Sequence, residues 1–217
     1  MFTIDNSPGK IKSVLILAPH TDDAEFGMGA TIAKFVEDGV QVYCAAFSAC
    51  KQNVRPEFPD DILIREVKKA SGVLGVQESN LFLFEYQVRT FHKFRQEILD
   101  DIIRLREKLN PDLVFIPSTG DIHQDHKVIS EEGIRAFKHH AILSYELPWN
   151  NFSFTTTCFS VLTKSQVQKK ADAIAQYKSQ AHRNYANPEF AWSLARTRGV
   201  QINQDYAECF EIIRLTF

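Results

Sequence analysis

The sequence has little of several features that would assign it to a class at once. No apolar run approaches the roughly 20 residues that a membrane-spanning helix needs. The formal net charge is only -2, which gives no electrostatic case for binding nucleic acid or an anionic membrane. Residues 1–10 lack the apolar core of a signal peptide. We therefore expect a cytoplasmic protein with no integral membrane segment and no nucleic-acid partner.

Cysteine is also scarce, and the four cysteines form no C-x-x-C pair. This argues against a structural zinc knuckle and against a disulfide framework. Hydrophobic residues make up 44% of the 217 residues and charged ones 24%, as in ordinary globular proteins. No linker or internal repeat is evident. We expect residues 1–217 to form a single domain in which residues 149–217 are a C-terminal extension that helps to roof the site.

Apolar runs and helical patterns alternate along the chain. The run at residues 11–18 is continuous, which is typical of a strand buried on both faces. Further strands are expected at residues 40–47, 81–84, 113–116, 141–145, 152–162 and 208–215. Helices are expected at residues 26–38, 59–76, 91–109, 126–137, 165–177 and 191–198. This order predicts an α/β fold, namely a Rossmann-like, doubly wound, mainly parallel sheet with helices on both faces.

Two groups of polar side chains follow strands of the predicted sheet. They are His20, Asp22 and Asp23 after the first strand, and His123, Asp125 and His126 after the strand at residues 113–116. In such a sheet the site lies at the C-terminal ends of the strands, so the two groups should converge. Three of these side chains suit a facial set of ligands for zinc, which leaves a carboxylate as a base. The pattern indicates a metal-dependent hydrolase.

Other interpretations exist for parts of this pattern. Asp22 and Glu25 resemble a helix-capping box, although two adjacent carboxylates exceed what one cap requires. Gly27 and Gly29 suggest the dinucleotide site of an oxidoreductase. That motif needs a third glycine, however, and the aspartates would repel a pyrophosphate. Asp125 is suited to hold one imidazole in the tautomer that its role requires.

The motifs resemble those of a known family. The segment P-H-T-D-D-A-E-F-G-M-G-A-T-I at residues 19–32 resembles the H-P-D-D-x-E-x-G-x-G-G-T motif of the PIG-L/LmbE-type zinc-dependent N-deacetylases. The segment at residues 123–126, H-Q-D-H, resembles their second motif, H-P-D-H. Less specific likeness at residues 66–75, 145–148 and 206–208 extends the resemblance over most of the chain. Thr21 and Gln124 replace the usual prolines, which removes no ligand.

The resemblance implies a role for each residue of the two motifs. His20, Asp23 and His126 would bind Zn2+, with another divalent metal such as Fe2+ as an alternative. Asp22 would be the general base and His123 the polarising or acid partner, a division that our reasoning from the residues leaves open. The implied reaction removes an N-acetyl group from an amino sugar that is free, nucleotide-linked or part of a glycoconjugate. Either Asp22 or His123 would protonate the leaving amine.

Substrate contacts are indicated less sharply. Arg65 could meet a hydroxyl or phosphate group, or form a surface ion pair. Trp149 could stack on a sugar face or belong to the core. Arg183, Arg196 and Arg198 form a basic group that suits a phosphate and suits a solvated face equally well.

Two other functions stay open. One is an amidase of the same fold that acts on a thiol conjugate or another non-sugar amide. The other is a non-catalytic sugar- or nucleotide-binding module. In either case the partner is a small molecule, and the oligomeric state is open, a homo-oligomer included.

Overall fold

The computed structural model describes residues 11–215, so the N-terminal residues 1–10, in which no signal peptide is expected, lie outside it. Within that range the strands form one sheet in the order β3-β2-β1-β4-β5-β7-β6. The strands are β1 (Ser13–His20), β2 (Gln41–Ser48), β3 (Leu81–Leu83), β4 (Leu113–Pro117), β5 (Ala141–Tyr145), β6 (Cys158–Leu162) and β7 (Tyr206–Arg214). Strands β1 to β5 are parallel, and β7 pairs antiparallel with both β5 and β6. The predicted α/β fold with a mainly parallel sheet is confirmed.

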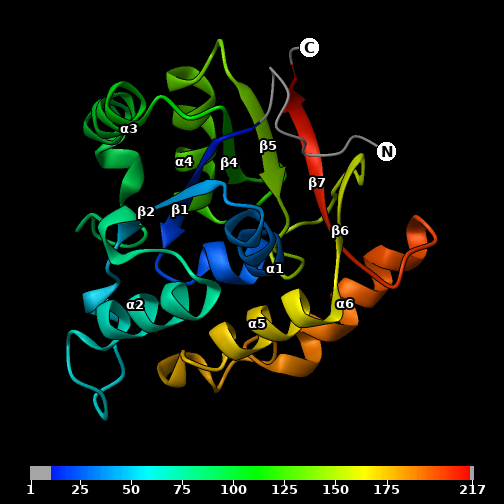
Figure 1. Cartoon of the computed structure of the whole chain (residues 1–217). Coiled ribbons are helices and arrows are strands. Elements are labelled where there is room, and N and C mark those ends of the chain that lie inside the picture. The colour runs from blue at the N-terminus through cyan, green and yellow to red at the C-terminus, as the bar shows by residue number, and fades with distance from the viewer. Residues whose placement is uncertain (1–10, 216–217) are drawn as a thin grey trace.

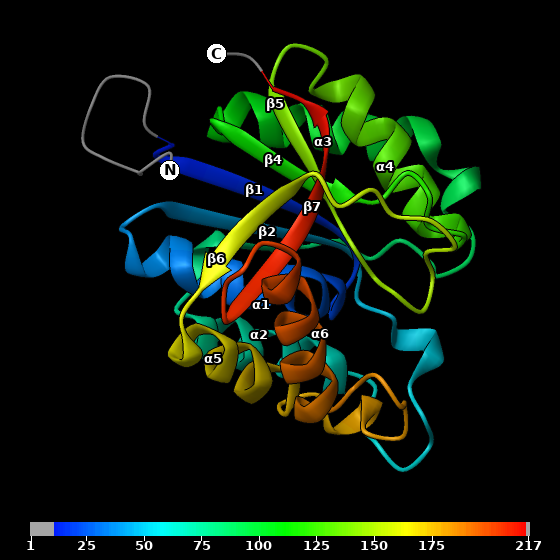
Figure 2. The ribbon, with the colours of Figure 1, turned by 90° about the vertical axis from the view of Figure 1, so that its right-hand side faces the viewer.

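Helices cover both faces of the sheet (Figures 1 and 2). They are α1 (Asp23–Glu37), α2 (Ile62–Leu74), α3 (Arg95–Leu109), α4 (Gln124–Ala136), α5 (Lys164–Ile174) and α6 (Pro188–Gln201). Helices α3 and α4 lie on one face, α1, α2 and α5 lie on the other, and α6 packs beside α5 and β7. None of these helices is long and apolar enough to span a bilayer, as judged over residues 11–215.

The double covering explains why β1 is continuously apolar. Val14 and Ile16 belong to the core beneath α1 and α2, whereas Leu15 and Leu17 belong to the core beneath α3 and α4. Because successive side chains of a strand point to opposite faces, a strand packed on both sides must be apolar at every position. The parallel pairing of β1 with β4 then places the C-terminal ends of these two strands side by side.

Some predicted boundaries in the last third and around residue 91 are corrected. The strand expected at residues 152–162 begins only at Cys158. Before it, the amide of Thr155 bonds the side chain of Glu211 on β7 at 2.8 Å, and not the backbone of that strand. The helix expected at residues 91–109 is divided into a single turn, η3 (Phe91–Lys93), and α3. Helix α6 is longer than expected and begins at Pro188, after an Asn187 side chain that caps it.

Gly27 sets how closely α1 approaches the sheet. A Cβ atom at this position would lie 2.4 Å from Cδ2 of Tyr145, so only glycine allows the helix to rest on that ring. The Tyr145 hydroxyl in turn donates a hydrogen bond to the backbone oxygen of Leu17, 3.0 Å away. The glycine that suggested a dinucleotide motif therefore serves packing, and it fixes the start of α1 against the ends of the strands.

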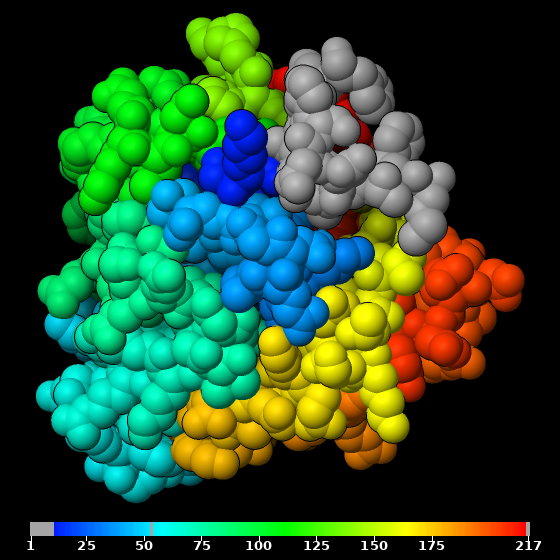
Figure 3. Space-filling model, in the orientation of Figure 1, coloured from blue at the N-terminus to red at the C-terminus, as the bar shows by residue number. Residues whose placement is uncertain are grey.

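Helix α2 and the C-terminal third of the chain, which are far apart in the sequence, lie side by side. In the space-filling view the cyan residues of α2 adjoin the yellow and orange residues of α5 and the turn that follows it (Figure 3). That turn, η4 (Lys178–Gln180), contacts α2 directly. The C-terminal third of the chain is thus brought next to the strand ends.

Candidate active site

A cavity of about 300 Å³ opens at the C-terminal ends of β1 and β4. Two regions of its wall are treated separately below, and Cys50, Leu63, Val88 and Arg89 complete the lining from other parts of the chain. The floor consists of residues at or after the ends of these two strands, namely His20, Asp22, Asp23, His123 and His126. The roof consists of residues from the C-terminal third, namely Trp149, Gln180, Arg183 and Tyr185.

The turn after β1 folds back on itself. The backbone N–H of His20 donates to Oδ2 of Asp23 at 2.8 Å, which draws that carboxylate toward the histidine. Asp22 occupies the position before the first turn of α1, yet its side chain makes no capping hydrogen bond. The capping-box interpretation is therefore wrong for Asp22, and its carboxylate is left facing the cavity.

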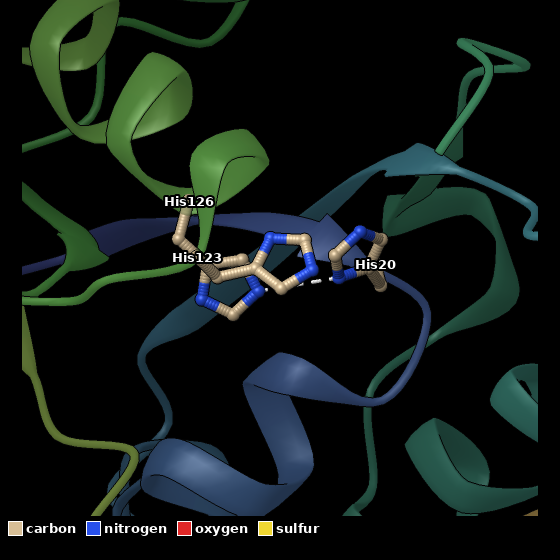
Figure 4. A group of neighbouring side chains, drawn as sticks. All are labelled: His20, His123 and His126. Carbon is tan, nitrogen blue, oxygen red and sulfur yellow. Dashed lines mark hydrogen bonds between the residues drawn. The ribbon is translucent and has the colours of Figure 1, made fainter. Parts of the chain in front are cut away.

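Three donor atoms of the floor form a small triangle. Nδ1 of His20 lies 3.1 Å from Oδ2 of Asp23 and 3.2 Å from Nε2 of His126. The third side, from Nε2 of His126 to Oδ2 of Asp23, measures 3.3 Å. Figure 4 shows the histidines converging from the end of β1 and the start of α4.

This triangle matches what a metal site requires. Three ligands at about 2.0–2.1 Å from a tetrahedral zinc lie about 3.3 Å from one another. A three-ligand set also leaves a position open, as in catalytic and not structural zinc sites. His123 belongs to a looser group with His20 and His126, whose ring nitrogens lie within 4.8 Å of one another. The structure brings together the three predicted ligands, and their occupation by a metal stays a prediction.

Two buried carboxylates orient the imidazoles from behind. Oδ2 of Asp125 lies 3.1 Å from Nε2 of His20, and Oδ2 of Asp121 lies 2.7 Å from Nδ1 of His126. Each carboxylate favours a hydrogen on the nitrogen that faces it, which leaves the other nitrogen free for the triangle. Asp125 thus contacts one imidazole, and its role in setting the tautomer of that ring stays a prediction.

The sequence interpretation missed Asp121. The signal that was available is its position in the loop between β4 and α4, two residues before His123. Its other oxygen accepts the backbone N–H of His123 at 2.8 Å, so one side chain organises both histidines of this loop.

The protonation preferences of the floor follow from burial and mutual charge. Burial alone would raise the pKa of Asp23, but the charges of His126 and His20 outweigh it and hold that pKa well below its usual range. Burial alone would lower the pKa of both imidazoles, yet the charge of Asp23 raises it to about 8 for His20 and about 10 for His126. The triangle therefore attracts positive charge, which protons supply when a metal does not.

Asp22 and His123 behave differently from these three residues. Burial, followed by the charge of Asp23, raises the pKa of Asp22 to about 6. Burial, followed by the charges of His126 and His20, lowers the pKa of His123 to about 4. Nδ1 of His123 accepts the backbone N–H of Asp125 at 3.2 Å, so the neutral ring carries its hydrogen on Nε2.

The two predicted substrate contacts have different positions. Trp149 lines the cavity and is half-buried, with its ring stacked on that of Tyr185 at 3.8 Å between centroids and 4° between planes. One face of the indole is thus already covered. Arg65 is not among the residues that line the cavity, and its exposed guanidinium pairs with Asp61 at 2.7 Å.

Comparisons with known proteins point to one family. Residues 15–137 match the family model of PIG-L, described as GlcNAc-PI de-N-acetylase. The uncharacterized deacetylase YaiS of Escherichia coli K12 is 25% identical over 181 residues, covering 80% of this chain and 95% of that protein. The diacetylchitobiose deacetylase of Thermococcus kodakarensis is 27% identical over 143 residues, covering 62% of this chain and 52% of that protein.

The fold itself also occurs with other chemistry. The solved structure of GalB, the 4-carboxy-2-hydroxymuconate hydratase from Pseudomonas putida KT2440, superposes with a TM-score of 0.76 at 20% identity. The alignment covers 95% of this chain and 99% of that one. Because one fold can carry different reactions, the reaction must be argued from the site.

Proposed function

The chain belongs to the PIG-L family, whose model matches more than half of the sequence, and on that premise we propose that it is a metal-dependent N-deacetylase acting on an amino sugar. One observation carries the proposal. The His20, Asp23 and His126 donor triangle faces a cavity beside the Asp22 carboxylate, which caps no helix. A metal-activated water and an adjacent base are what amide hydrolysis by such a site requires.

The metal would be held by His20, Asp23 and His126. A divalent ion bound there lowers the pKa of a water molecule and polarises an acyl carbonyl. Asp22 lines the cavity and caps no helix, so its carboxylate is available to accept a proton. Asp22 takes the proton of the attacking water and holds it within the cavity.

His123 stabilises the negative charge that develops on the carbonyl oxygen. Its pKa of about 4 keeps the ring neutral near pH 7, and the bond from the Asp125 amide leaves the hydrogen on Nε2. A fixed N–H donor aimed at a developing oxyanion supplies a large part of the rate enhancement in acyl transfer. Because a neutral His123 has no spare proton to give, we assign protonation of the leaving amine to Asp22.

An amino sugar is the substrate class that the surroundings favour. The 27% identical relative is named for its action on diacetylchitobiose, which consists of N-acetylated amino sugars. The stacked rings of Trp149 and Tyr185 give the cavity a flat aromatic surface of the kind that sugars pack against. Zinc as the native metal, the cytoplasmic location and a homo-oligomer stay predictions.

The test is amine release by purified protein of known metal content. We expect metal-loaded protein to release a free amine and acetate from N-acetylglucosamine, its simple glycosides or its nucleotide-linked form. Chelation should abolish this release, and added zinc or iron(II) should restore it. Release from non-sugar amides alone would favour the amidase alternative. If loaded protein releases no amine from any of these compounds, the proposal is wrong.

A further inference from the structure

The buried Tyr177 joins the C-terminal third of the chain to the turn after β1. It lies between α5 and η4, and its ring is stacked on that of Phe26 in α1, with the centroids 6.0 Å apart. Its hydroxyl donates a hydrogen bond to the backbone oxygen of Thr21 at 2.6 Å. Tyr177 does not line the cavity, so it can affect a reaction there only through the residues that it holds.

The oxygen that Tyr177 holds belongs to the peptide group between Thr21 and Asp22. A peptide group is planar, so a bond to its oxygen restricts the whole plane from Cα of Thr21 to Cα of Asp22. The side chain of Thr21 does not anchor this turn, because its hydroxyl is buried with no hydrogen-bond partner among residues 11–215. Tyr177 therefore supplies an attachment that Thr21 itself does not.

The three predicted metal ligands are supported by other bonds. The backbone N–H of His20 donates to the carboxylate of Asp23, and buried carboxylates contact the rings of His20 and His126. Among residues 11–215 the carboxylate of Asp22 makes no hydrogen bond with another residue, and Arg183 attracts it by charge without forming an ion pair. The direction of the Asp22 side chain therefore depends on its backbone, because the backbone angles decide which rotamers are allowed.

The position of Tyr177 is itself fixed from both sides. Its backbone N–H donates to the oxygen of Ile174 at the end of α5, at 3.1 Å. Two residues after Tyr177, the buried carboxylate of Glu66 on α2 accepts the backbone N–H of Ser179 at 3.0 Å and its hydroxyl at 2.5 Å. A donor supported in this way presents one geometry to Thr21, as a residue that orients another must do.

We propose that Tyr177 is a positioning residue for the reaction, because its hydrogen bond to the Thr21–Asp22 peptide aims the Asp22 carboxylate into the cavity. The inference rests on the proposed function, since the direction of Asp22 matters only if Asp22 is the base. A base must lie within hydrogen-bond reach of the proton that it takes, and a displacement of about 1 Å can cost about 10²-fold in rate. Tyr177 itself transfers no proton.

The first test compares two variants that each remove one buried hydroxyl. Tyr177→Phe breaks the bond to Thr21, whereas Tyr145→Phe breaks the 3.0 Å bond to the backbone oxygen of Leu17, a residue of β1 that is held by pairing with β2. The substrate is the N-acetylglucosamine compound that the wild type deacetylates fastest. We expect Tyr177→Phe to lower kcat by about tenfold to 10²-fold, and Tyr145→Phe to keep the kcat of the wild type. KM should stay within about twofold and the metal content should not change, because only the direction of the base is altered.

A second test shows whether Tyr177 acts through Asp22. In the Asp22→Asn background no base is left to aim, so the addition of Tyr177→Phe should lower kcat no further. A role in general rigidity would instead lower kcat by the same factor in both backgrounds, because the effects of independent sites on a free energy add.

Crystal structures of the metal-loaded wild type and of both single variants provide a readout that needs no turnover. We expect the Asp22 carboxylate to be displaced by about 1 Å in Tyr177→Phe and to keep its place in Tyr145→Phe. An unmoved carboxylate in Tyr177→Phe overturns the inference. This measurement decides the inference even if no N-acetylated compound is hydrolysed and the proposed function fails.

Other results would overturn the inference while leaving the deacetylase intact. They are an unchanged kcat in Tyr177→Phe, an effect confined to KM, a loss of bound metal, and an equal fall of kcat in Tyr145→Phe. A further fall of kcat when Tyr177→Phe is added to Asp22→Asn would do the same.

Discussion

The floor and the roof of the cavity differ in how the chain builds them. Each floor residue lies between the end of β1 or β4 and the first turn of the helix that follows it, and the parallel pairing of these strands brings the two groups together. The roof residues follow irregular segments, and their positions depend on contacts with distant elements such as α2. The floor is thus set by local sequence and strand order, whereas the roof is set by long-range packing. We expect chemistry to depend on the first and substrate choice on the second.

The largest effect on activity should come from substituting the two adjacent aspartates of the floor one at a time. Asp22→Asn should lower kcat by about 10²- to 10⁴-fold, the usual contribution of a general base, and should keep the bound metal. Asp23→Asn should instead lose metal, because it removes a corner of the donor triangle. Metal content and kcat measured on both variants check this division.

Titration with metal provides the control for that experiment. Excess divalent metal should partly restore Asp23→Asn by mass action, and it should leave Asp22→Asn unchanged. If Asp22→Asn purifies without metal, or Asp23→Asn retains it at full occupancy, the roles of the two carboxylates have been assigned wrongly.

Most of the floor residues could be predicted from the sequence because they lie close to the ends of recognisable strands. Continuous apolar runs indicated buried parallel strands, and the polar groups that follow two of them had to meet at one edge. The spacing of the residues could not show which of the two aspartates joins the donor triangle. That choice depends on the turn after β1, in which the backbone N–H of His20 donates to the carboxylate of Asp23. Asp121 was missed for a similar reason, because an orienting carboxylate becomes evident only when the imidazole that it contacts is in place.

The roof was predictable only as a region. The sequence indicated that residues 149–217 extend the fold and help to roof the site, which stays a prediction; in the structure, β6 and β7 belong to the same sheet as β1 to β5. No periodicity marks the stretch between α5 and α6, so neither the stacking of Tyr185 on Trp149 nor the anchoring of Ser179 could be derived. Buried pairs between distant residues carry no signal in one sequence.

An intermediate effect on stability and activity should follow from removing the hydrogen bonds that attach the roof to α2, because this leaves the floor residues unchanged. Glu66→Ala removes the acceptor of both Ser179 hydrogen bonds, and among residues 11–215 Glu66 forms no hydrogen bond or ion pair with a floor residue. Bonds to a buried carboxylate are worth enough that we expect the free energy of unfolding to fall by about 2 kcal/mol. We expect kcat/KM to fall about tenfold with the metal content unchanged. Denaturant unfolding, metal analysis and kinetics on one preparation check all three values.

Two further variants serve as an intermediate case and a control for Glu66→Ala. Glu66→Gln keeps an acceptor for the Ser179 amide and should lie between the wild type and the alanine variant. Glu78→Ala removes an exposed partner of Lys68 and should match the wild type in all three measurements. Loss of metal in Glu66→Ala would mean that the floor and the roof are not independent.

The smallest effect should come from Arg65→Gln, which tests whether this arginine belongs to either region. Its guanidinium pairs with Asp61 one helical turn earlier, and the two side chains are 60% and 47% exposed. An exposed pair at this spacing contributes about 0.3–0.5 kcal/mol, because solvent screens the charges and ordering both chains costs entropy. We expect a change of that size in the free energy of unfolding, and kcat/KM within about twofold of the wild type. A substrate role would require α2 to turn Arg65 away from Asp61 and into the cavity, and a tenfold rise in KM would show that it does. Arg183→Gln, measured beside it, supplies the contrast, because the same substitution then removes a guanidinium that lines the cavity.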